Sequence, residues 1–319
     1  MKVSFAFAIL NESLRLDKCL SSIRSQIYPQ NLIEIVIADG GSEDNSKEIS
    51  INYNAVVIDN PAGLAEPGGV LAHSYASGDI KIFFAADNVL PHEKWVKELV
   101  DIYNSNPNIV GVYTHIASSK NDYKLNKYYS ELHVEPFTFF IYGNAANPRY
   151  FDSLYEQIHT LGPYKHYKFD IENHPLIAFA QGFSVRNTYI RPDDTIMDDI
   201  EPVMRMIDSN QIFVYGPQLG IHHYHLSTFK NYIKKFKIRI DNTLQNNDFG
   251  INSRNKRLNL KRRLNKYVFI MCGLLIIPTL VETLFLTISR KNLVMLYHAP
   301  ASIILAYLIL FRYINNILK

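Results

Sequence analysis

Residues 33–46 read IEIVIADGGSEDNS and join a short apolar run to an acidic, glycine-rich turn. The run 33–38 is rich in β-branched residues and too short for an ordinary helix, so it predicts a buried strand. Gly40 and Gly41 allow the backbone to approach a ligand closely. Asp44 and Ser46 are residue types that cap helices. The stretch therefore predicts a strand, a ligand-facing loop and a helix in succession.

Similar short apolar runs lie on both sides of this stretch. They cover residues 3–10, 56–58, 80–85 and 109–113. Between them, apolar residues recur at helical spacing: Leu16, Leu20, Ile23 and Ile27 after the first run, and Trp95, Leu99 and Tyr103 after Pro91, which we expect to open that helix. Strands that alternate with helices predict an α/β domain with a Rossmann-like, mostly parallel sheet.

An acidic residue follows three of these runs: Asp39, Asp59 and Asp87. Parallel strands end at the same edge of a sheet, and ligands of open α/β sheets bind at that edge. One such aspartate would be interpreted as a helix cap or a turn residue, but three together predict a binding site. The sequence contains no P-loop and no dinucleotide-binding GxGxxG, which weakens the kinase, ATPase and dehydrogenase interpretations.

The composition is typical of a folded protein in a reducing compartment. The 319 residues are 47% hydrophobic and 20% charged, which differs strongly from disordered chains. At about 150 residues per domain, this length predicts about two domains. Two cysteines, Cys19 and Cys272, cannot form the disulfide framework of a small secreted protein.

Charge is distributed unevenly along the chain. Residues 1–226 carry 17 basic and 27 acidic side chains, whereas residues 227–319 carry 16 basic and 3 acidic ones. A basic C-terminal part beside an acidic body predicts an anionic partner. Its charges flank apolar runs rather than stacking aromatics, so we expect membrane lipid and no nucleic acid.

Two long apolar runs lie in this basic part, at residues 267–288 and 293–311. Each is long enough to cross ~30 Å of hydrocarbon, which takes about 20 helical residues. Four residues separate them, so they predict an antiparallel two-helix hairpin. Residues 254–266 carry seven Lys or Arg and no acid, which indicates the cytoplasmic side of a membrane.

The hairpin admits more than one arrangement. Pro278 and Pro300 are able to kink its helices, and Arg290 and Lys291 in the turn fit the positive-inside rule poorly. A re-entrant hairpin that dips into one leaflet is therefore an alternative to two transmembrane helices, and core helices of a soluble domain are a third. Glu282 is either a functional intramembrane carboxylate or the partner of a residue across the hairpin.

Four segments in the first hundred residues resemble, in order and spacing, the nucleotide-binding half of a family 2 glycosyltransferase of the GT-A fold. They are Asn11-Glu12, residues 33–46, residues 60–69 (NPAGLAEPGG) and residues 76–88 (ASGDIKIFFAADN). The resemblance implies nucleotide-sugar-binding residues for a UDP- or GDP-linked donor: Glu12 and Asp39 on the nucleoside, Asp59 near the base, Gly40 in the loop, and Asp87 on the diphosphate through Mg²⁺ or Mn²⁺.

Two positions depart from the family pattern. Ala85 replaces the first aspartate of the family's aspartate-x-aspartate motif, and Gly68 and Gly69 replace an arginine–asparagine pair. Mg²⁺ keeps several waters and takes one or two carboxylates plus phosphate oxygens. Asp87 is therefore able to act as the metal ligand alone or together with Asn88. The alternative is a degenerate, non-catalytic nucleotide-sugar-binding subunit.

Residues 197–217 resemble the acceptor side of such enzymes. The resemblance implies a general base for an acceptor hydroxyl, which we assign to Asp199, with Asp198 as the alternative. A purely structural interpretation is that both aspartates cap the following helix. Gln181 and Gly182 resemble the loop before the acceptor subsite, although strand-turn chemistry explains them equally well.

Residues 221–225 (IHHYH) contain three histidines. The family resemblance implies one near the diphosphate or the metal, and His223 fits that position best because neutral imidazole is a metal ligand. The alternative is that these histidines are simply interfacial residues beside a membrane-proximal helix.

We therefore expect a membrane-associated inverting glycosyltransferase that moves a sugar from a nucleotide-sugar donor to a lipid-linked or glycan acceptor. Its catalytic domain would lie on the cytoplasmic side of the cell membrane. A polyprenyl- or dolichyl-phosphate sugar synthase is the alternative within the class, because such an acceptor is already anionic and needs no base.

This interpretation divides the chain into three parts. A GT-A domain covers residues 1–226, with a nucleotide-sugar half at 1–116 and an acceptor half at 117–226. Residues 227–266 form a basic segment on the membrane surface, and residues 267–319 form the transmembrane or re-entrant hairpin. The surface segment has apolar residues at the spacing of an amphipathic helix: Phe229, Ile233, Phe236 and Ile240.

Overall fold

The structure is a computed structural model that describes residues 1–159, 162–170, 173–245 and 260–317. The chain forms two units, of which the first comprises Met1–Ala117 and Pro148–His223. The second comprises Ser118–Asn147 and Tyr224–Lys319. Residues 118–147 thus group with the C-terminal helices, although the sequence placed them in the acceptor half. The functional division of the chain stays a prediction.

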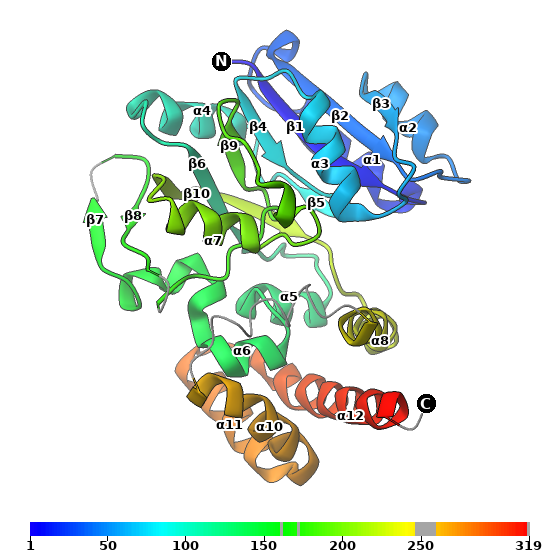
Figure 1. Cartoon of the computed structure of the whole chain (residues 1–319), viewed down its shortest axis with the longest axis vertical. Helices are drawn as coiled ribbons and strands as arrows, with labels where there is room; N and C mark the ends of the chain where they lie inside the picture. The colour runs from blue at the N-terminus through cyan, green and yellow to red at the C-terminus, as the bar shows by residue number, and fades with distance from the viewer. Residues whose placement is uncertain (160–161, 171–172, 246–259, 318–319) are drawn as a thin grey trace. The chain divides into compact units, whose positions relative to one another are not determined.

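The first unit is built on an eight-stranded sheet (Figure 1). Across the sheet, the order is β3 (Val56–Asp59), β2 (Ile33–Asp39), β1 (Val3–Ile9), β4 (Ile80–Phe83), β9 (Ser184–Arg186), β6 (Gly111–Ala117), β10 (Phe213–His223) and β5 (Asn88–Val89). Strands β1 to β4 are parallel to one another, and β6 is parallel to β10. β9 is antiparallel to both its neighbours, and β5 is antiparallel to β10. The predicted mostly parallel α/β sheet is confirmed.

Helices cover both faces of this sheet. α1 (Ser13–Arg24) and α4 (Trp95–Ser105) pack on one face, and α3 (Ala65–Tyr75) packs on the other. Because side chains alternate along a strand, β1 presents Phe5 and Phe7 to the first face and Ala6 to the second. Small residues on the second face allow α3 to approach the sheet closely.

The remaining elements of the first unit are short. They are η1 (Gln30–Leu32), α2 (Ser46–Asn52), η3 (Pro148–Ser153), η4 (Asp193–Thr195), α7 (Glu201–Asp208) and the hairpin of β7 (Gln157–His159) and β8 (His166–Tyr167). Two predicted boundaries are wrong. Pro91 does not open α4, which begins at Trp95, and Ile27 lies beyond α1 and is exposed.

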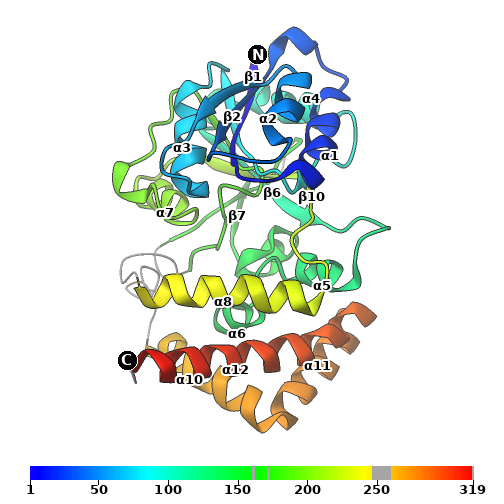
Figure 2. The same cartoon turned by 90° about the vertical axis from the view of Figure 1, so that its right-hand side faces the viewer.

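The described residues of the second unit form helices only. They are α5 (Lys124–Leu132), α6 (Pro136–Tyr142), η2 (Gly143–Ala146), α8 (Phe229–Gln245), α10 (Leu260–Leu275), α11 (Ile277–Ser289), η5 (Leu293–Tyr297) and α12 (His298–Ile317) (Figure 2). The predicted amphipathic segment corresponds to α8, whereas residues 254–259 of the predicted basic cluster lie outside the described residues.

The first predicted apolar run is not one helix. α10 and α11 meet at Ile276, whose φ of 63° is left-handed, and their axes are bent by 99°. Pro278 follows in the first turn of α11, where its missing N–H costs nothing. Pro300 lies in the first turn of α12, which therefore stays unbroken. By length and composition Leu293–Ile317 is able to cross a membrane, and α10 with α11 would do so only as one bent span.

Glu282 has a polar partner across the hairpin. Its Oε2 lies 3.4 Å from Nε2 of His298, at the start of α12. The ring of His298 is buried, and its Nδ1 lies 2.9 Å from the hydroxyl of Tyr128. This contact supports the interpretation that Glu282 is the partner of a residue across the hairpin rather than a functional intramembrane carboxylate.

Candidate active site

Asp39 and Asp59 lie side by side at the carboxyl edge of the sheet, because β2 and β3 are in register there. Nζ of Lys47 lies 3.3 Å from Oδ2 of Asp39 and 3.7 Å from Oδ1 of Asp59. The Asp39 side chain is fully buried, whereas that of Asp59 is 93% exposed. The first aspartate is therefore a fixed part of the site, and the second is open to a ligand.

The carboxylate of Asp39 accepts hydrogen bonds from the backbone N–H groups of Gly41 at 3.1 Å and Ser42 at 3.1 Å. Burial raises the pKa of Asp39, but the hydrogen bonds from Ser42, Lys47 and Gly41 outweigh burial and hold this pKa below its usual range. Gly40 is closely packed, because a Cβ there would lie 3.3 Å from the Cα of Gly63 and 3.4 Å from the carbonyl oxygen of Ile9.

Glu12 lies in the loop after β1, which is fastened to the loop after β2. The N–H of Glu12 donates to Oγ of Ser46 at 2.8 Å, and the N–H of Asn11 donates to Oγ of Ser42 at 2.9 Å. Asp44 accepts from the N–H of Ser46 at 3.0 Å, but the N-cap of α2 is Asn45, so neither Asp44 nor Ser46 is the cap residue. The polar residues at the end of the stretch 33–46 thus form the loop at the edge of the sheet and hold Glu12 in position.

Arg15 connects Glu12 with Asp87. Its Nη1 lies 3.9 Å from Oε2 of Glu12 and 3.8 Å from Oδ2 of Asp87. The four acids that the sequence singled out therefore gather at one edge, and two cations, Arg15 and Lys47, lie among them. These two cations are not among the predicted site residues, although the spacing of Glu12 and Arg15 at the start of α1 is a detectable signal.

Asp87 faces His223 at the end of β10. Oδ1 of Asp87 lies 3.4 Å from Nδ1 of His223, and the two side chains are only 13% and 12% exposed. The carbonyl of Ala85 accepts the N–H of Asn88 at 3.0 Å, which closes the turn that presents Asp87. Residue 85, where the family pattern has an aspartate, thus contributes its backbone carbonyl to the turn, and no side chain is required for this hydrogen bond.

Asn88 forms a hydrogen bond with the ring of His223. Its Nδ2 donates to the carbonyl of Ala180 at 2.9 Å, so its Oδ1 must accept from Nδ1 of His223, 2.7 Å away. Nε2 then carries the lone pair that a metal would use. A carboxylate and a neutral imidazole suit a divalent cation, with the remaining positions taken by water or phosphate oxygens.

The other two histidines of residues 221–225 have different surroundings. Nδ1 of His222 lies 3.1 Å from the carbonyl of Ala117, in the sheet. His225 belongs to the second unit, where its ring stacks on Tyr129 at 4.7 Å. In the first unit, His223 is the histidine of this group that lies beside Asp87.

The two neighbouring aspartates at the start of α7 differ in their contacts. Oδ1 of Asp198 accepts the N–H groups of Ile200 at 2.7 Å and Glu201 at 3.1 Å, so Asp198 caps the helix. Asp199 instead accepts the N–H of Phe179 with its backbone carbonyl at 3.0 Å. The capping interpretation therefore applies to Asp198, and Asp199 is the better candidate for a base.

The segment 179–183 connects Asp199 with the end of β4, because it contacts both. The ring of Phe179 lies 4.5 Å from that of Phe83, and the N–H of Gly182 donates to the carbonyl of Phe83 at 3.1 Å. Gly182 has a left-handed φ of 80°, and the carbonyl of Gln181 accepts from the hydroxyl of Thr114. These contacts of Gln181 and Gly182 are those of a strand turn.

Arg191 is a charged neighbour of Asp199 that the sequence did not reveal. Its guanidinium lies 5.7 Å from the Phe83 ring centre and 5.4 Å from that of Phe179. Nη2 donates to the carbonyls of Thr195 at 2.7 Å and Asp198 at 2.9 Å. Burial lowers the pKa of Arg191, and the negative charge of Asp199 opposes this effect. No motif around Arg191 signals this position.

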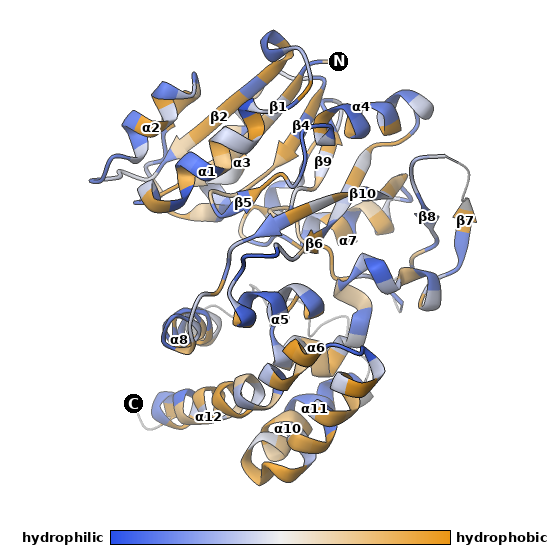
Figure 3. Cartoon of the chain, turned by 180° about the vertical axis from the view of Figure 1, so that it is seen from behind, coloured by the Kyte–Doolittle hydropathy of each residue, from blue (hydrophilic) through white to orange (hydrophobic). Residues whose placement is uncertain are grey.

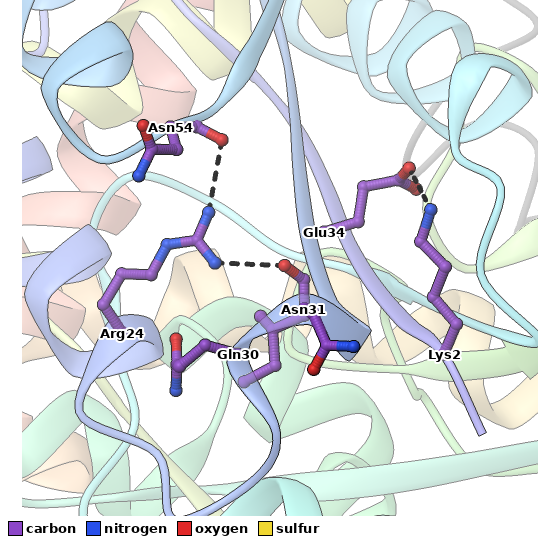
Figure 4. A pocket seen from close by; sticks show the side chains of 7 residues that line it. Lys2, Arg24, Gln30, Asn31, Glu34 and Asn54 are labelled. Atoms are coloured by element: carbon purple, nitrogen blue, oxygen red, sulfur yellow. Dashed lines mark hydrogen bonds and ion pairs between the residues drawn. The ribbon is translucent and has the colours of Figure 1, made fainter.

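A surface pocket lies at the opposite edge of the sheet, where the strands begin (Figure 4). It is lined by residues that include Lys2, Arg24 and Glu34. Arg24 donates to the carbonyls of Ile33 and Asn54, and Lys2 pairs with Glu34 at 2.7 Å. These contacts join strand and helix ends, and none of the acids discussed above lines this pocket.

Residues 4–169, just over half of the chain, match the family model described as Glycosyl transferase family 2. Over 102 residues the chain is 32% identical to Glycosyltransferase AglE of Haloferax volcanii, which covers 30% of this chain and 33% of that protein. Over 123 residues it is 28% identical to the Uncharacterized glycosyltransferase alr2836 of Nostoc sp., covering 36% and 37%. The chain thus matches about a third of the length of these curated relatives.

The solved structure of mannosyltransferase PcManGT from Pyrobaculum calidifontis, in complex with GDP-Man and Mn²⁺, is similar with a TM-score of 0.53. The match covers 99% of this chain and 87% of that chain at 11% sequence identity. At this identity the similarity concerns the fold alone, and it confirms the predicted GT-A architecture of the sheet.

Proposed function

The chain belongs to glycosyl transferase family 2, and from this premise we propose that it is a metal-dependent inverting glycosyltransferase attached to a membrane. Its donor would be a UDP- or GDP-linked sugar, and its acceptor a lipid-linked sugar or a glycan. The observation that carries the proposal is the position of Asp87, which lies 3.4 Å from His223 and 3.8 Å from Arg15 at the ligand-binding edge of the sheet.

The edge of the sheet supplies the groups that a nucleoside diphosphate needs. Glu12 and the exposed Asp59 would offer carboxylates to ribose hydroxyls and to the base, and the buried Asp39 would hold the loop beside them. Arg15 and Lys47 lie among these acids and bring positive charge to a site that would otherwise repel a diphosphate. The donor-side assignment therefore combines recognition of the nucleoside with neutralisation of the phosphates.

Asp87 and Nε2 of His223 would hold Mg²⁺ or Mn²⁺, as their chemistry fits such an ion. A bound divalent cation supplies Lewis-acid stabilisation of the charge on the departing nucleoside diphosphate. The Mn²⁺ and GDP-Man of PcManGT support this assignment by similarity of fold. His223 is held in one tautomer by Asn88, which fixes its basic nitrogen before an ion arrives.

Asp199 would act as the general base. The oxygen of an acceptor hydroxyl attacks the anomeric carbon while the bond from that carbon to the diphosphate breaks, and the leaving group takes the electron pair. The hydroxyl proton passes to the carboxylate of Asp199. The guanidinium of Arg191 lies close enough to interact electrostatically with this carboxylate. A single displacement of this kind inverts the anomeric centre.

Arg191 also favours a second candidate acceptor. A guanidinium next to the base would attract a phosphate, so transfer to polyprenyl or dolichyl phosphate is the alternative. Such an acceptor needs no base. The catalytic unit would lie on the cytoplasmic side of the membrane in both cases, as the basic residues around α10 and in α8 favour.

The test is a screen of radiolabelled UDP- and GDP-sugars with membrane lipid extract. We expect transfer by the native protein that requires Mg²⁺ or Mn²⁺ and is lost on chelation. Asp87→Ala should lower transfer by about a hundredfold or more, whereas Asp101→Ala, an exposed acid paired with Lys97 on α4, should not. Transfer by Asp87→Ala at the native rate would refute the metal-dependent mechanism.

A further inference from the structure

We propose that the second unit is a monotopic membrane anchor, in which the described parts of α10, α11 and α12 enter one leaflet and none crosses the bilayer. The partner is the surface of a bilayer that contains anionic phospholipid. The proposal rests on the proposed membrane association and deepens it, because it chooses between the spanning and the re-entrant arrangements.

Both ends of the α10–α11 pair are held by the same short helix. The guanidinium of Arg262, near the start of α10, lies 5.6 Å from the Tyr142 ring centre. That of Arg290, just after α11, lies 5.2 Å from the Phe139 ring centre. Tyr142 and Phe139 both belong to α6, which has seven residues and is therefore about 10 Å long. The contacts of one short helix with both ends favour a pair that returns to the side of the membrane from which it left.

The end of α11 is also anchored by hydrogen bonds. Arg290 donates from Nη1 to the carbonyl of Glu131 at 2.7 Å and from Nη2 to Oδ1 of Asn144 at 2.6 Å. These partners lie at the end of α5 and in η2, which are polar parts of the second unit. The position of Arg290, which fitted the positive-inside rule poorly for a spanning hairpin, is explained if both ends of the pair lie on one side.

The pair presents an apolar surface from its apex along α11. Exposed residues on it include Leu275 at 60% and Ile277 at 71% beside the apex, and Val281 at 64%, Phe285 at 68% and Ile288 at 66% farther along α11. Figure 3 shows the hydrophobic colour along α10 and α11. Each arm is about 20 Å long, and at a bend of 99° the apex reaches at most about 15 Å, half of the ~30 Å hydrocarbon core. The surface therefore matches the depth of one leaflet.

α12 is kept out of a crossing by its attachment to α8. Near one end, the hydroxyl of Tyr232 donates to the carbonyl of Ala301 at 3.1 Å. Near the other end, Arg312 pairs with Asp241 at 2.7 Å. The two helices accordingly run side by side in Figure 2. We therefore place α12 at the same depth in the membrane as α8 along the whole length of α12.

α8 cannot pass through hydrocarbon because its outer face is basic. The side chains of Lys230, Lys234, Lys237 and Arg239 are exposed along it. A lysine or arginine at the centre of a bilayer is strongly unfavourable, whereas one near anionic headgroups is stabilised by their negative charge. α8 thus belongs at the phosphate layer, and α12, fixed to it near both ends, lies along the surface although it is long enough to cross.

The experiment is accessibility labelling of cysteines introduced one at a time into the full chain carrying Cys272→Ser, in which the remaining Cys19 is fully buried. Lys237→Cys on α8, Lys291→Cys after α11 and Asn316→Cys near the end of α12 are treated with a charged maleimide in right-side-out and inverted vesicles. We expect all three to react from the same side. Two crossings would place Lys291→Cys opposite the other two, and its reaction from that opposite side would overturn the proposal.

A second measurement tests insertion itself. Purified protein should float with vesicles of phosphatidylcholine and phosphatidylglycerol and bind several-fold less to pure phosphatidylcholine. A fluorophore on Ile277→Cys should be quenched by brominated lipid, and one on Leu14→Cys, an exposed apolar site of the first unit, should not. Protein that stays soluble, or that pairs with a second copy through this surface instead of floating, would overturn the proposal. Neither measurement uses a sugar nucleotide, so its outcome is separate from that of the transfer assay.

Discussion

The Nδ1 atom of His223 donates a hydrogen bond to the Oδ1 atom of Asn88, 2.7 Å away across 135 residues of sequence. Asn88 is fully buried and its Nδ2 is occupied by the carbonyl of Ala180. The amide therefore cannot rotate without losing both bonds. A residue that the family resemblance offered only as a helper of Asp87 acts in the structure on the histidine, which it holds in one tautomer.

Replacement of Asn88 should weaken metal binding without removing a ligand. In Asn88→Ala the His223 ring loses its fixed tautomer, and we expect the affinity for Mn²⁺ to fall about 10- to 100-fold, measured by calorimetric titration. Asn108→Ala, in an exposed turn of the same unit, is the control. Native Mn²⁺ affinity in a folded Asn88→Ala protein would contradict the role assigned to this amide.

Asp199→Asn should separate the two acceptor classes. If the acceptor is a hydroxyl, we expect kcat to fall about 10²- to 10⁴-fold, since the amide cannot take its proton. Asp193→Asn, an exposed position in the same loop region, should leave kcat unchanged. Initial rates with each identified acceptor are the measurement. Activity retained with a polyprenyl phosphate acceptor would remove the base from the mechanism and select the synthase alternative.

Two adjacent glycines of α3 should respond oppositely to alanine. A Cβ on Gly68 would lie 2.4 Å from Nδ2 of Asn60 and 2.7 Å from the Cβ of Ala8, whereas one on Gly69 meets nothing within 4 Å. We expect Gly68→Ala to lower the free energy of unfolding by about 1 to 3 kcal/mol. Gly69→Ala should raise it by about 0.5 to 1 kcal/mol because alanine favours helix.

Urea denaturation of both glycine variants is the measurement. A Gly68→Ala protein as stable as the native one would show that α3 is able to move away from β1. The expected difference would also explain the absence of the family's arginine at this position, since the close packing of α3 on Ala8 excludes any side chain.

Glu34 should make stability depend on acidic pH. Burial raises its pKa, but hydrogen bonds from Lys2, Ser4 and Ser77 outweigh burial and lower the pKa to about 2. A folded-state pKa below the unfolded one stabilises the protein above about pH 4.5, and this contribution disappears as the pH falls to about 2. Glu34→Gln should therefore cost about 1 to 2 kcal/mol near pH 7, after allowance for solvent screening, and little at pH 2.

Urea denaturation from pH 2 to pH 7 checks this dependence. Glu48→Gln, an exposed glutamate on α2, is the matched control and should be nearly neutral throughout. A cost of Glu34→Gln that stays constant across this range would indicate lost packing rather than lost ionisation.

The central strands and the acids at their ends could be predicted because both are local features of the sequence. A short apolar run followed by Asp-Gly-Gly predicts the strand, the end of the strand and the ligand-facing loop within 14 residues. Asp39, Asp59 and Asp87 follow such runs, and parallel pairing then brings them to one edge.

Other parts depend on contacts between distant residues and have no local pattern. β9 has three residues, too few for a periodicity, and only its antiparallel pairing between β4 and β6 defines it. Arg191 is placed by two aromatic rings that lie far from it in the sequence. The break at Ile276 falls inside an apolar run, where hydropathy indicates length but not direction.

The pairing of β5 with β10 has a consequence for biogenesis. Glu12, Asp39 and Asp87 are synthesised early in translation. His223 belongs to a strand that is synthesised more than a hundred residues later. A nascent chain that has already collapsed around its first four strands still lacks the imidazole opposite Asp87. The proposed cation site would therefore be complete only after His223 has been synthesised, when most of the chain has been translated.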